Sequence, residues 1–574
     1  MMKNNLFRKA FQITLPLLIV AGGYLSLAIG GREDHQFEIS KNMEIFGTLY
    51  QQLNKLYVDE PKPGQLMKTG IDAMLASLDP YTNYITEEEI EDYKIQISGH
   101  YGGVGVQVRI IDGEFVVAEP YEGFAAHKAG IKAGDIIQEV NGNKIKGKTF
   151  EQVGKLMKGV AGSPVKVKIL RPGETEPREY DLLREEVKVK NVTHSTLLEN
   201  NTGYIRLSNF MENAGVEVRQ SVLDLKEKGA TSFILDLRGN PGGLLQEAVN
   251  IVNCFVERGQ LIVSMKGRVR EWDKQFRTSM TPVDTKVPLV VLTDEHSASA
   301  SEIVAGSLQD LDRAVVVGQR SFGKGLVQQT VPLVYNSMLK VTIAKYYTPS
   351  GRCVQSLDYS HRDANGVSRV PDSLITAFKT KNGRTVWDGL GVIPDIELPG
   401  RTYSVLADTL MKKGIIFNYA TEYARKHASI AAPDQFTLSD TEYDEFVKWA
   451  AAKNVKYVTP EEKALKQFKK NADQSGAFNT FSADYTQLSK KLEDSKADDF
   501  VQYKSEIKVL LESEIASRYY YQQGRVAASL RNDPVMTEAM GLLKNTQKLN
   551  SILTTVVVKE KPRQRSDMEK KDEE

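Results

Sequence analysis

The sequence predicts a multidomain α/β protein, with a helical segment at residues 37–99, a compact β-rich module at 100–186, an α/β core at 187–400 and a mostly helical region at 401–558. Three observations support this fold class. Short strand-like runs separated by turns fill the module, strand and helix signals alternate through the core, and helical apolar spacing dominates the last region. The 574 residues allow about three or four domains.

The N-terminus resembles a targeting segment. Lys3, Arg8 and Lys9 precede an apolar run at 13–29, which is slightly longer than a signal-peptide core of about 7–15 residues and shorter than the roughly 20 that span a membrane comfortably. Residues 1–31 are therefore predicted to be a signal peptide or an uncleaved membrane anchor. Either places the body in the periplasm or on the outer side of the cytoplasmic membrane. The alternative is a buried N-terminal helix.

Bulk composition narrows the function classes. With 75 basic and 74 acidic side chains and no long basic run, nothing suggests nucleic-acid binding. The two cysteines, Cys254 and Cys353, could pair in an exported protein, but the favoured interpretation is two isolated small apolar residues. No Cys/His cluster has the spacing of a zinc site, so no metal and no cofactor is expected.

Helical spacing before the module predicts helices at 37–57 and 65–78, and a third capped near Thr86. In the module, apolar and polar residues alternate in short runs between turn residues. This pattern predicts strands at 104–108, 114–117, 136–140 and 165–170, and helices at 125–129 and 149–157.

Apolar runs bounded by turn residues predict the elements of the core. Strands are expected at 233–237, 288–293, 314–317, 326–333 and 338–347, and helices at 244–256 and 299–308. The last residues, 559–574, are mixed in charge and nearly without apolar groups, which predicts disorder.

Ser299 is the candidate nucleophile. It follows a predicted strand by a short turn and opens a helix, whose first N–H groups and positive dipole end favour a developing oxyanion. The small neighbours Ala298 and Ala300 let a substrate backbone approach. The alternative is an ordinary helix cap, since serine is a favoured N-cap residue.

Lys324 is the candidate base. It lies between Gly323 and Gly325, and burial without a counter-ion would lower the pKa of its amine until it can accept a proton. Gln328, four residues on, could hold the amine by a hydrogen bond. The alternatives are a surface lysine or a phosphate loop, and the second fails because no G-x-x-x-x-G-K-[ST] pattern is present.

The segment 236–243 (DLRGNPGG) ends another predicted strand. Its glycines can turn backbone N–H groups toward an anion, and one of them could form an oxyanion hole with the N–H of Ala300. A simple strand-to-helix turn is the alternative. His296 suggests a Ser/His/Asp triad, but a surface or capping role for it is favoured.

Together these stretches resemble the C-terminal (tail-specific) processing serine peptidases, a family of exported enzymes with an inserted PDZ domain. The matching segments span residues 78–398. They are 78–82 (LDPYT), 101–106 (YGGVGV), 129–137 with 141–142 (AGIKAGDII, NG), 236–243, 297–302 (SASASE) and 322–325 (FGKG) with Gln328.

The resemblance implies a crotonase/Clp-like peptidase core in which Ser299 is the nucleophile, Lys324 the general base and Gln328 its orienting partner. The oxyanion donors implied are the backbone N–H groups of Ala300 and of Gly242 or Gly243, which the sequence does not separate. One departure is an insertion at 356–388 between 348–352 (TPSGR) and 389–395 (GLGVIPD), whose role is open.

A PDZ domain implies recognition of a free C-terminus, with the substrate tail added as a strand beside 104–108. An apolar last residue would enter a pocket, unless the module only packs internally or gates the site. The implied tail-binding residues are Gly102, Gly103, Val104, Gly105 and Val106 for the carboxylate and Phe150, Val153 and Leu156 for the pocket.

The expected function is that of an exported serine endopeptidase which hydrolyses proteins near unstructured C-terminal tails. The alternative is a catalytically inactive PDZ scaffold that binds envelope proteins. The expected partners are protein substrates with unstructured C-termini, and a second copy or an adaptor docking through 401–558.

Overall fold

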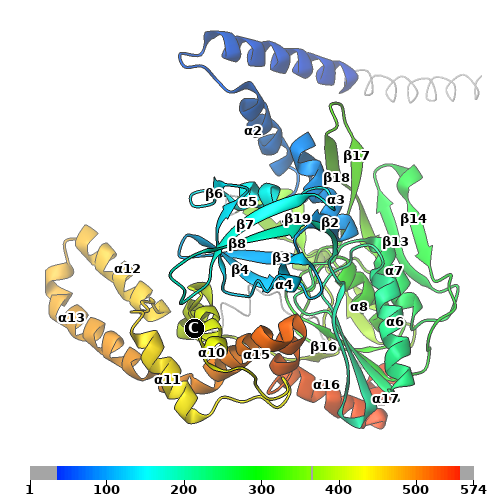
Figure 1. The fold of residues 1–574 in the computed structure, drawn as a ribbon. Coiled ribbons are helices and arrows are strands. Elements are labelled where there is room, and N and C mark those ends of the chain that lie inside the picture. Colours follow the sequence, from blue (N-terminus) through cyan, green and yellow to red (C-terminus); the bar gives the residue numbers. More distant parts are fainter. Residues whose placement is uncertain (1–34, 364–365, 556–560, 562–574) are drawn as a thin grey trace, which may run out of the picture. The chain divides into compact units, whose positions relative to one another are not determined.

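A computed structural model describes residues 35–363, 366–555 and 561 (Figure 1). The predicted signal or anchor and all but one residue of the tail predicted to be disordered lie outside these residues. The chain divides into two compact units, Met1–Tyr84 and Ile85–Glu574. Within the described ranges, no helix combines the length and the apolar character needed to cross a membrane.

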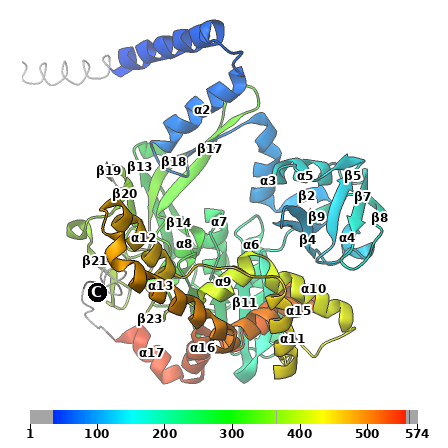
Figure 2. The same cartoon turned by 90° about the vertical axis from the view of Figure 1, so that its left-hand side faces the viewer.

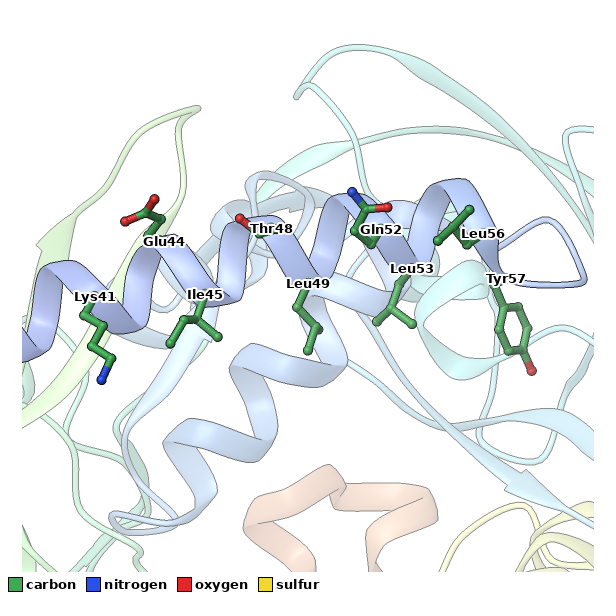
Figure 3. A pocket seen from close by; sticks show the side chains of 9 residues that line it. All are labelled: Lys41, Glu44, Ile45, Thr48, Leu49, Gln52, Leu53, Leu56 and Tyr57. Carbon is green, nitrogen blue, oxygen red and sulfur yellow. The ribbon is translucent and has the colours of Figure 1, made fainter.

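The first unit consists of a helix at 35–56 and α2 (Pro63–Ala76), which begins with proline at its first turn. The helix at 35–56 has a row of exposed apolar side chains, including Ile45, Leu49 and Leu53, along a hollow of about 760 Å³ (Figure 3). None of the predicted site residues lies in this unit.

The β-rich module is a sheet with strand order β3-β4-β5-β7-β8, and β6 pairs with β5. Two strands outside that sheet, β2 (His100–Gly103) and β9 (Glu185–Lys188), pair antiparallel where the chain enters and leaves the module. The module is therefore an insertion with adjacent ends. Its other elements are β3 (Val106–Ile111), β4 (Glu114–Pro120), α4 (Ala125–Lys128), β5 (Ile136–Val140), β6 (Asn143–Lys144), α5 (Phe150–Met157), β7 (Pro164–Leu170) and β8 (Arg178–Leu183).

The α/β core is built on a six-stranded sheet in which β10 (Val192–Leu198) is antiparallel to β11 (Thr202–Leu207) and the other neighbours are parallel. The remaining strands are β12 (Ser232–Asp236), β15 (Leu289–Thr293), β16 (Val315–Gly318) and β23 (Ile396–Glu397). Every residue of β12, β15 and β16 is buried, as in sheets covered by helices on both faces.

The two faces of this sheet are covered by different parts of the chain. One face packs on α6 (Ala214–Glu227), α7 (Leu245–Asn253) and α8 (Ala300–Asp310). The other packs on α16 (Pro534–Lys544) and α17 (Thr546–Thr554), which come from the C-terminal helical region (Figure 2). The last two helices of that region thus complete the core.

The rest of the C-terminal region has a hydrophobic core of its own, shared by α9 (Val405–Lys412), α10 (Ile415–Lys426), α11 (Asp440–Ala451) and α15 (Lys504–Ser529). Two further helices, α12 (Pro460–Gln474) and α13 (Phe478–Ser495), pack against each other through Phe468 and Phe481.

A second, antiparallel sheet includes β13 (Leu261–Gly267), β14 (Lys274–Arg277), β17 (Leu326–Pro332) and β18 (Met338–Tyr347). The insertion at 356–388 folds as two hairpins, β19 (Leu357–Asp363) with β20 (Gly366–Arg369) and β21 (Ala377–Lys379) with β22 (Thr385–Trp387). Cys254 and Cys353 are both free thiols. The predicted fold class, an α/β core with an inserted β-rich module and flanking helical regions, is confirmed.

Candidate active site

Ser299 lies between β15 and α8, at the start of the helix. Its backbone has φ +55° and ψ −111°, a region that residues with a side chain rarely adopt and that surrounding contacts must hold. Those contacts come from the preceding residues: Ala298 N–H donates to Asn240 O (3.0 Å) and Ser297 Oγ donates to Leu237 O (2.9 Å). The turn carrying Ser299 is thereby fixed to the segment 236–243.

Glu302 joins the turn of Ser299 to the loop of Lys324. Its Oε2 accepts hydrogen bonds from the backbone N–H groups of both Ser299 and Lys324, each at 2.8 Å. Its Oε1 accepts from Gly323 N–H (2.7 Å) and Ser321 Oγ (2.5 Å). Complete burial raises the pKa of Glu302 to about 7, although all four donors favour the ionised form.

Tyr346, a buried residue of β18, makes a second link. Its hydroxyl lies 3.1 Å from Ser299 O and 2.8 Å from Lys324 O, and its single proton can be donated to either. The backbones of Ser299 and Lys324 therefore lie side by side and share two hydrogen-bonding partners. Neither Glu302 nor Tyr346 was among the residues predicted for the site.

The loop of Lys324 is also held by Gln355 and Ser356, where the chain enters the insertion. Ser356 N–H donates to Gly323 O (2.9 Å), and Gly325 N–H donates to Gln355 Oε1 (2.8 Å). Gly323 has φ +90°, and a Cβ there would fall 2.2 Å from Ser356 Oγ, so only glycine fits. The entry to the insertion thus supports this loop.

Gly242 lies directly against Ser299, and the next residue, Gly243, lies against the backbone of Phe210. A Cβ on Gly242 would fall 2.8 Å from Ala300 N and 2.9 Å from Ser299 Cβ. Gly242 N–H donates to Asn240 Oδ1 (2.9 Å). Among the described residues, the structure records no acceptor for the N–H of Gly243 or that of Ala300, which makes this pair the better suited to a developing oxyanion.

The strand that ends before these glycines, β12, is fixed at its last residue, Asp236, by hydrogen bonds and ion pairs. Asp236 is fully buried and accepts hydrogen bonds from Tyr204 Oη (2.7 Å), Arg206 Nη1 (2.9 Å) and Arg238 Nη2 (2.7 Å). Burial alone would raise the pKa of the Asp236 carboxyl, but Arg206 and Arg238 outweigh it and hold that pKa well below its usual range.

Gln328 and His296 have less direct relations to Ser299. Gln328 lies on β17, next to a bulge, and its amide nitrogen donates to Thr342 Oγ1 (3.1 Å). The side chain of His296 is 73% exposed and lies 3.9 Å from Glu295. This exposure fits the surface role that was favoured for His296.

A groove of about 900 Å³ lies between β3 and α5 in the β-rich module. Helix α3 (Ile90–Ser98) adds a third wall, and an ion pair between Lys158 Nζ and Asp92 (2.5 Å) joins α5 to α3. The groove is lined mainly by apolar groups, namely Val104, Gly105, Val106, Val108, Phe150, Val153, Gly154 and Met157.

Three residues predicted for this groove are placed elsewhere. Gly102 and Gly103 are paired with β9. Leu156 packs on the core of the module, and Met157 lines the groove instead. The groove face of α5 follows the helical spacing i, i+3, i+4, i+7 from Phe150, which passes through position 157 and not 156.

Comparisons with known proteins agree with these features. A model described as peptidase family S41 matches residues 201–359, a PDZ-domain model matches 116–171, and a model described as the C-terminal helical domain of a probable PDZ-protease matches 406–543. The carboxy-terminal-processing protease of Bartonella bacilliformis is 35% identical over 350 residues, covering 59% of this chain and 80% of that protein.

Two further proteins are similar to this chain. A probable CtpA-like serine protease of Staphylococcus haemolyticus is 32% identical over 406 residues, covering 70% of this chain and 76% of that protein. The solved structure of the photosystem II D1 C-terminal processing protease is 27% identical, covers 62% of this chain and 92% of its own, and superposes with a TM-score of 0.33.

Proposed function

The chain belongs to the carboxy-terminal-processing proteases of peptidase family S41, and we propose that it is an exported serine endopeptidase that cleaves proteins near unstructured C-terminal tails with a Ser299/Lys324 dyad. The observation that carries this proposal is the pair of partners shared by the two residues. Glu302 and Tyr346 bind the backbone of both. A nucleophile and a base from distant segments are useful only if such contacts hold them together.

The proposed reaction is amide hydrolysis through an acyl-enzyme. The neutral amine of Lys324 takes the proton of Ser299 Oγ as the oxygen attacks the substrate carbonyl carbon. The N–H groups of Gly243 and Ala300 stabilise the oxyanion. Lys324 then gives the proton to the leaving amine as the C–N bond breaks. Water, deprotonated by the same amine, releases the acyl group and restores the Ser299 hydroxyl.

The side-chain oxygen of Gln328 is the proposed orienting group for this amine. The amide nitrogen of Gln328 is already used by Thr342, so the oxygen is the atom suited to accept a hydrogen bond from Lys324. Such a bond would direct one N–H of the amine without blocking its lone pair.

The PDZ groove is the proposed site for the substrate's free C-terminus. An extended tail would pair with β3, its carboxylate would meet the N–H groups near Val104–Val106, and an apolar last side chain would contact Phe150, Val153 and Met157. Protein substrates with flexible ends are therefore favoured over folded ones.

Peptide cleavage with mass-spectrometric detection of products tests this function. Peptides carrying an apolar C-terminal residue, with a free or an amidated terminus, are incubated with wild type, Ser299→Ala and His296→Ala. We expect wild type and His296→Ala to cleave the free-ended peptide faster than the amidated one. Ser299→Ala should cleave neither peptide. A wild-type protein that binds the free end without cleaving it would leave the PDZ scaffold as the function.

Export is a proposal that rests on the basic residues and the apolar run before position 31. Cell fractionation of the tagged protein tests it, and recovery in the cytoplasm would contradict it.

Association through 401–558 also stays a prediction. Light scattering of wild type over a range of concentrations checks it.

A further inference from the structure

Asp533 caps the first turn of α16 and also reaches the core. Its Oδ1 accepts hydrogen bonds from the N–H groups of Val535 (2.9 Å) and Met536 (3.3 Å), as expected of an N-cap aspartate. Its Oδ2 accepts from Arg238 Nη1 at 2.6 Å. The side chains are 13% and 15% exposed, so the ion pair is largely shielded from water.

Arg238 is held on both edges of its guanidinium plane. On one edge, Nε and Nη2 donate to the two oxygens of Asp236, at 3.0 and 2.7 Å, and on the other Nη1 donates to Asp533. Burial alone would lower the pKa of Arg238, but the two carboxylates raise it well above its usual value. A charged, planar group bound at both edges has one orientation.

The segment after Arg238 leads within five residues to Gly243. Its far side is bound to the turn of Ser299, where Asn240 O accepts from Ala298 N–H and from Ser301 Oγ (2.9 Å). Its near side is bound through Arg238, whose carbonyl accepts from Arg206 Nη2 (2.8 Å). A shift of Arg238 would therefore displace Gly243 and change the direction of its N–H group.

Helix α16 is itself immobilised on the sheet. Met536 and Leu542 are buried against the face that contains Tyr204 and Ile234. The carboxylate of Asp533 is thus presented from a rigid element, as a positioning group needs to be.

Resting on the proposed function, we propose that Asp533 is a positioning residue of the peptidase: from the C-terminal helical region it fixes Arg238, and through Arg238 the loop that presents the N–H of Gly243 to the oxyanion. The helical region then contributes to transition-state stabilisation as well as to the fold. By contrast, Ser439, the N-cap of α11 in the same region, is bonded only within its own helix.

Two substitutions separate this role from helix capping. Asp533→Ser keeps a good N-cap and is too short to reach Arg238. Asp533→Asn has one carbonyl oxygen, which can serve the helix or Arg238 but not both. Ser439→Ala is the matched control, because it removes a cap in the same region without contact to the core.

The assay is steady-state cleavage of the free-ended peptide, with kcat expressed per folded molecule from the circular dichroism signal. We expect kcat to fall about tenfold in both Asp533 variants, with KM within about twofold, because an oxyanion donor acts on the transition state. Affinity for a peptide aldehyde, whose adduct with Ser299 carries the oxyanion, should weaken by the same factor. Ser439→Ala should leave kcat unchanged.

A kcat per folded molecule that stays within about twofold of wild type in both Asp533 variants, or a loss confined to folded fraction, would overturn this inference. If wild type still cleaves and Ser299→Ala does not, the proposed function survives that result. A wild-type protein that fails to cleave overturns both.

Discussion

At the scale of single residues, Glu302 connects the two segments that carry Ser299 and Lys324. It is fully buried, and its two oxygens accept four hydrogen bonds that together join the turn of Ser299 to the loop of Lys324. Only the ionised carboxylate can accept all four, because a protonated one has to donate at one oxygen. Burial makes that ionised form costly, so the site depends on a group that titrates near neutrality.

The replacement Glu302→Gln tests this role. An amide would turn an N–H toward groups that are themselves donors, so we expect kcat to fall about 100-fold through misplacement of the dyad. Glu295→Gln, on the exposed part of the same turn, is the control and should keep wild-type kcat. Equal activity of the two variants would show that Glu302 does not position the dyad.

The pH dependence of stability follows from the raised pKa of Glu302, about 7 against its usual 4.5. A raised folded-state pKa favours the folded state below pH 4.5, and this contribution is lost as the pH rises through about 7. We expect the stability of the Glu302→Gln variant not to show that decrease as the pH rises. Thermal unfolding of both proteins from pH 4 to 8 measures it, and parallel curves would contradict the assignment.

Sequence patterns made Ser299 and Lys324 the candidate nucleophile and base because small residues and glycines beside a reactive side chain are local signals. Glu302 had a local signal that was not used: the spacing Ser-x-x-Glu is that of a capping box. Tyr346 had none, since a tyrosine in a strand is common and its bonds to Ser299 and Lys324 depend on tertiary packing.

At the scale of elements, α5 determines the shape of the PDZ groove. Gly154 lies on its groove face, and a Cβ there would meet no atom within 4 Å. Its backbone is helical, so a larger side chain can be placed there without strain. The groove can therefore be filled at one position without disturbing the core of the module.

The series Gly154→Ala and Gly154→Leu separates helix stability from tail binding. Alanine should stabilise the module by about 1 kcal/mol and leave the groove open. Leucine should also favour the helix but occupy the groove, so we expect Kd for a free-ended peptide to rise at least about tenfold. Fluorescence anisotropy in the Ser299→Ala background measures this, and unchanged binding in the leucine variant would place tail recognition elsewhere.

Local alternation and turns predicted β5 and β18 with the bounds that the structure has, 136–140 and 338–347. They did not predict β10, whose half-buried polar residues, such as His194 and Thr196, blur the alternation. On α5, Phe150 and Val153 were predicted to line the groove and do so, but Leu156 was predicted at the place that Met157 takes. Periodicity tells which helix face is apolar more reliably than which side chain ends in a groove.

At the scale of the whole molecule, the C-terminal region serves two structures. Its first helices and α15 share a core of their own, whereas α16 and α17 cover the second face of the peptidase sheet. Helical periodicity predicted this region as helical, but it could not predict what each apolar face packs on. Contacts between residues hundreds of positions apart decide that.

Two fully buried leucines in the helical region, Leu542 in α16 and Leu511 in α15, distinguish these structures. Either change to alanine should cost about 3 kcal/mol by leaving a cavity. We expect Leu542→Ala to speed hydrogen exchange in the central strands β12, β15 and β16, and Leu511→Ala to speed it only in α9–α11 and α15. Identical exchange maps for the two variants would mean that the region behaves as one body.

The most direct test of the account is the kcat/KM of Lys324→Arg on a protein with a flexible, free C-terminal tail. Arginine has a long side chain that ends in N–H donors, as lysine has, but it stays protonated in proteins and cannot accept the Ser299 proton. The account predicts cleavage no faster than that of Ser299→Ala. An activity within about tenfold of wild type would contradict it, because a general base is worth more than that.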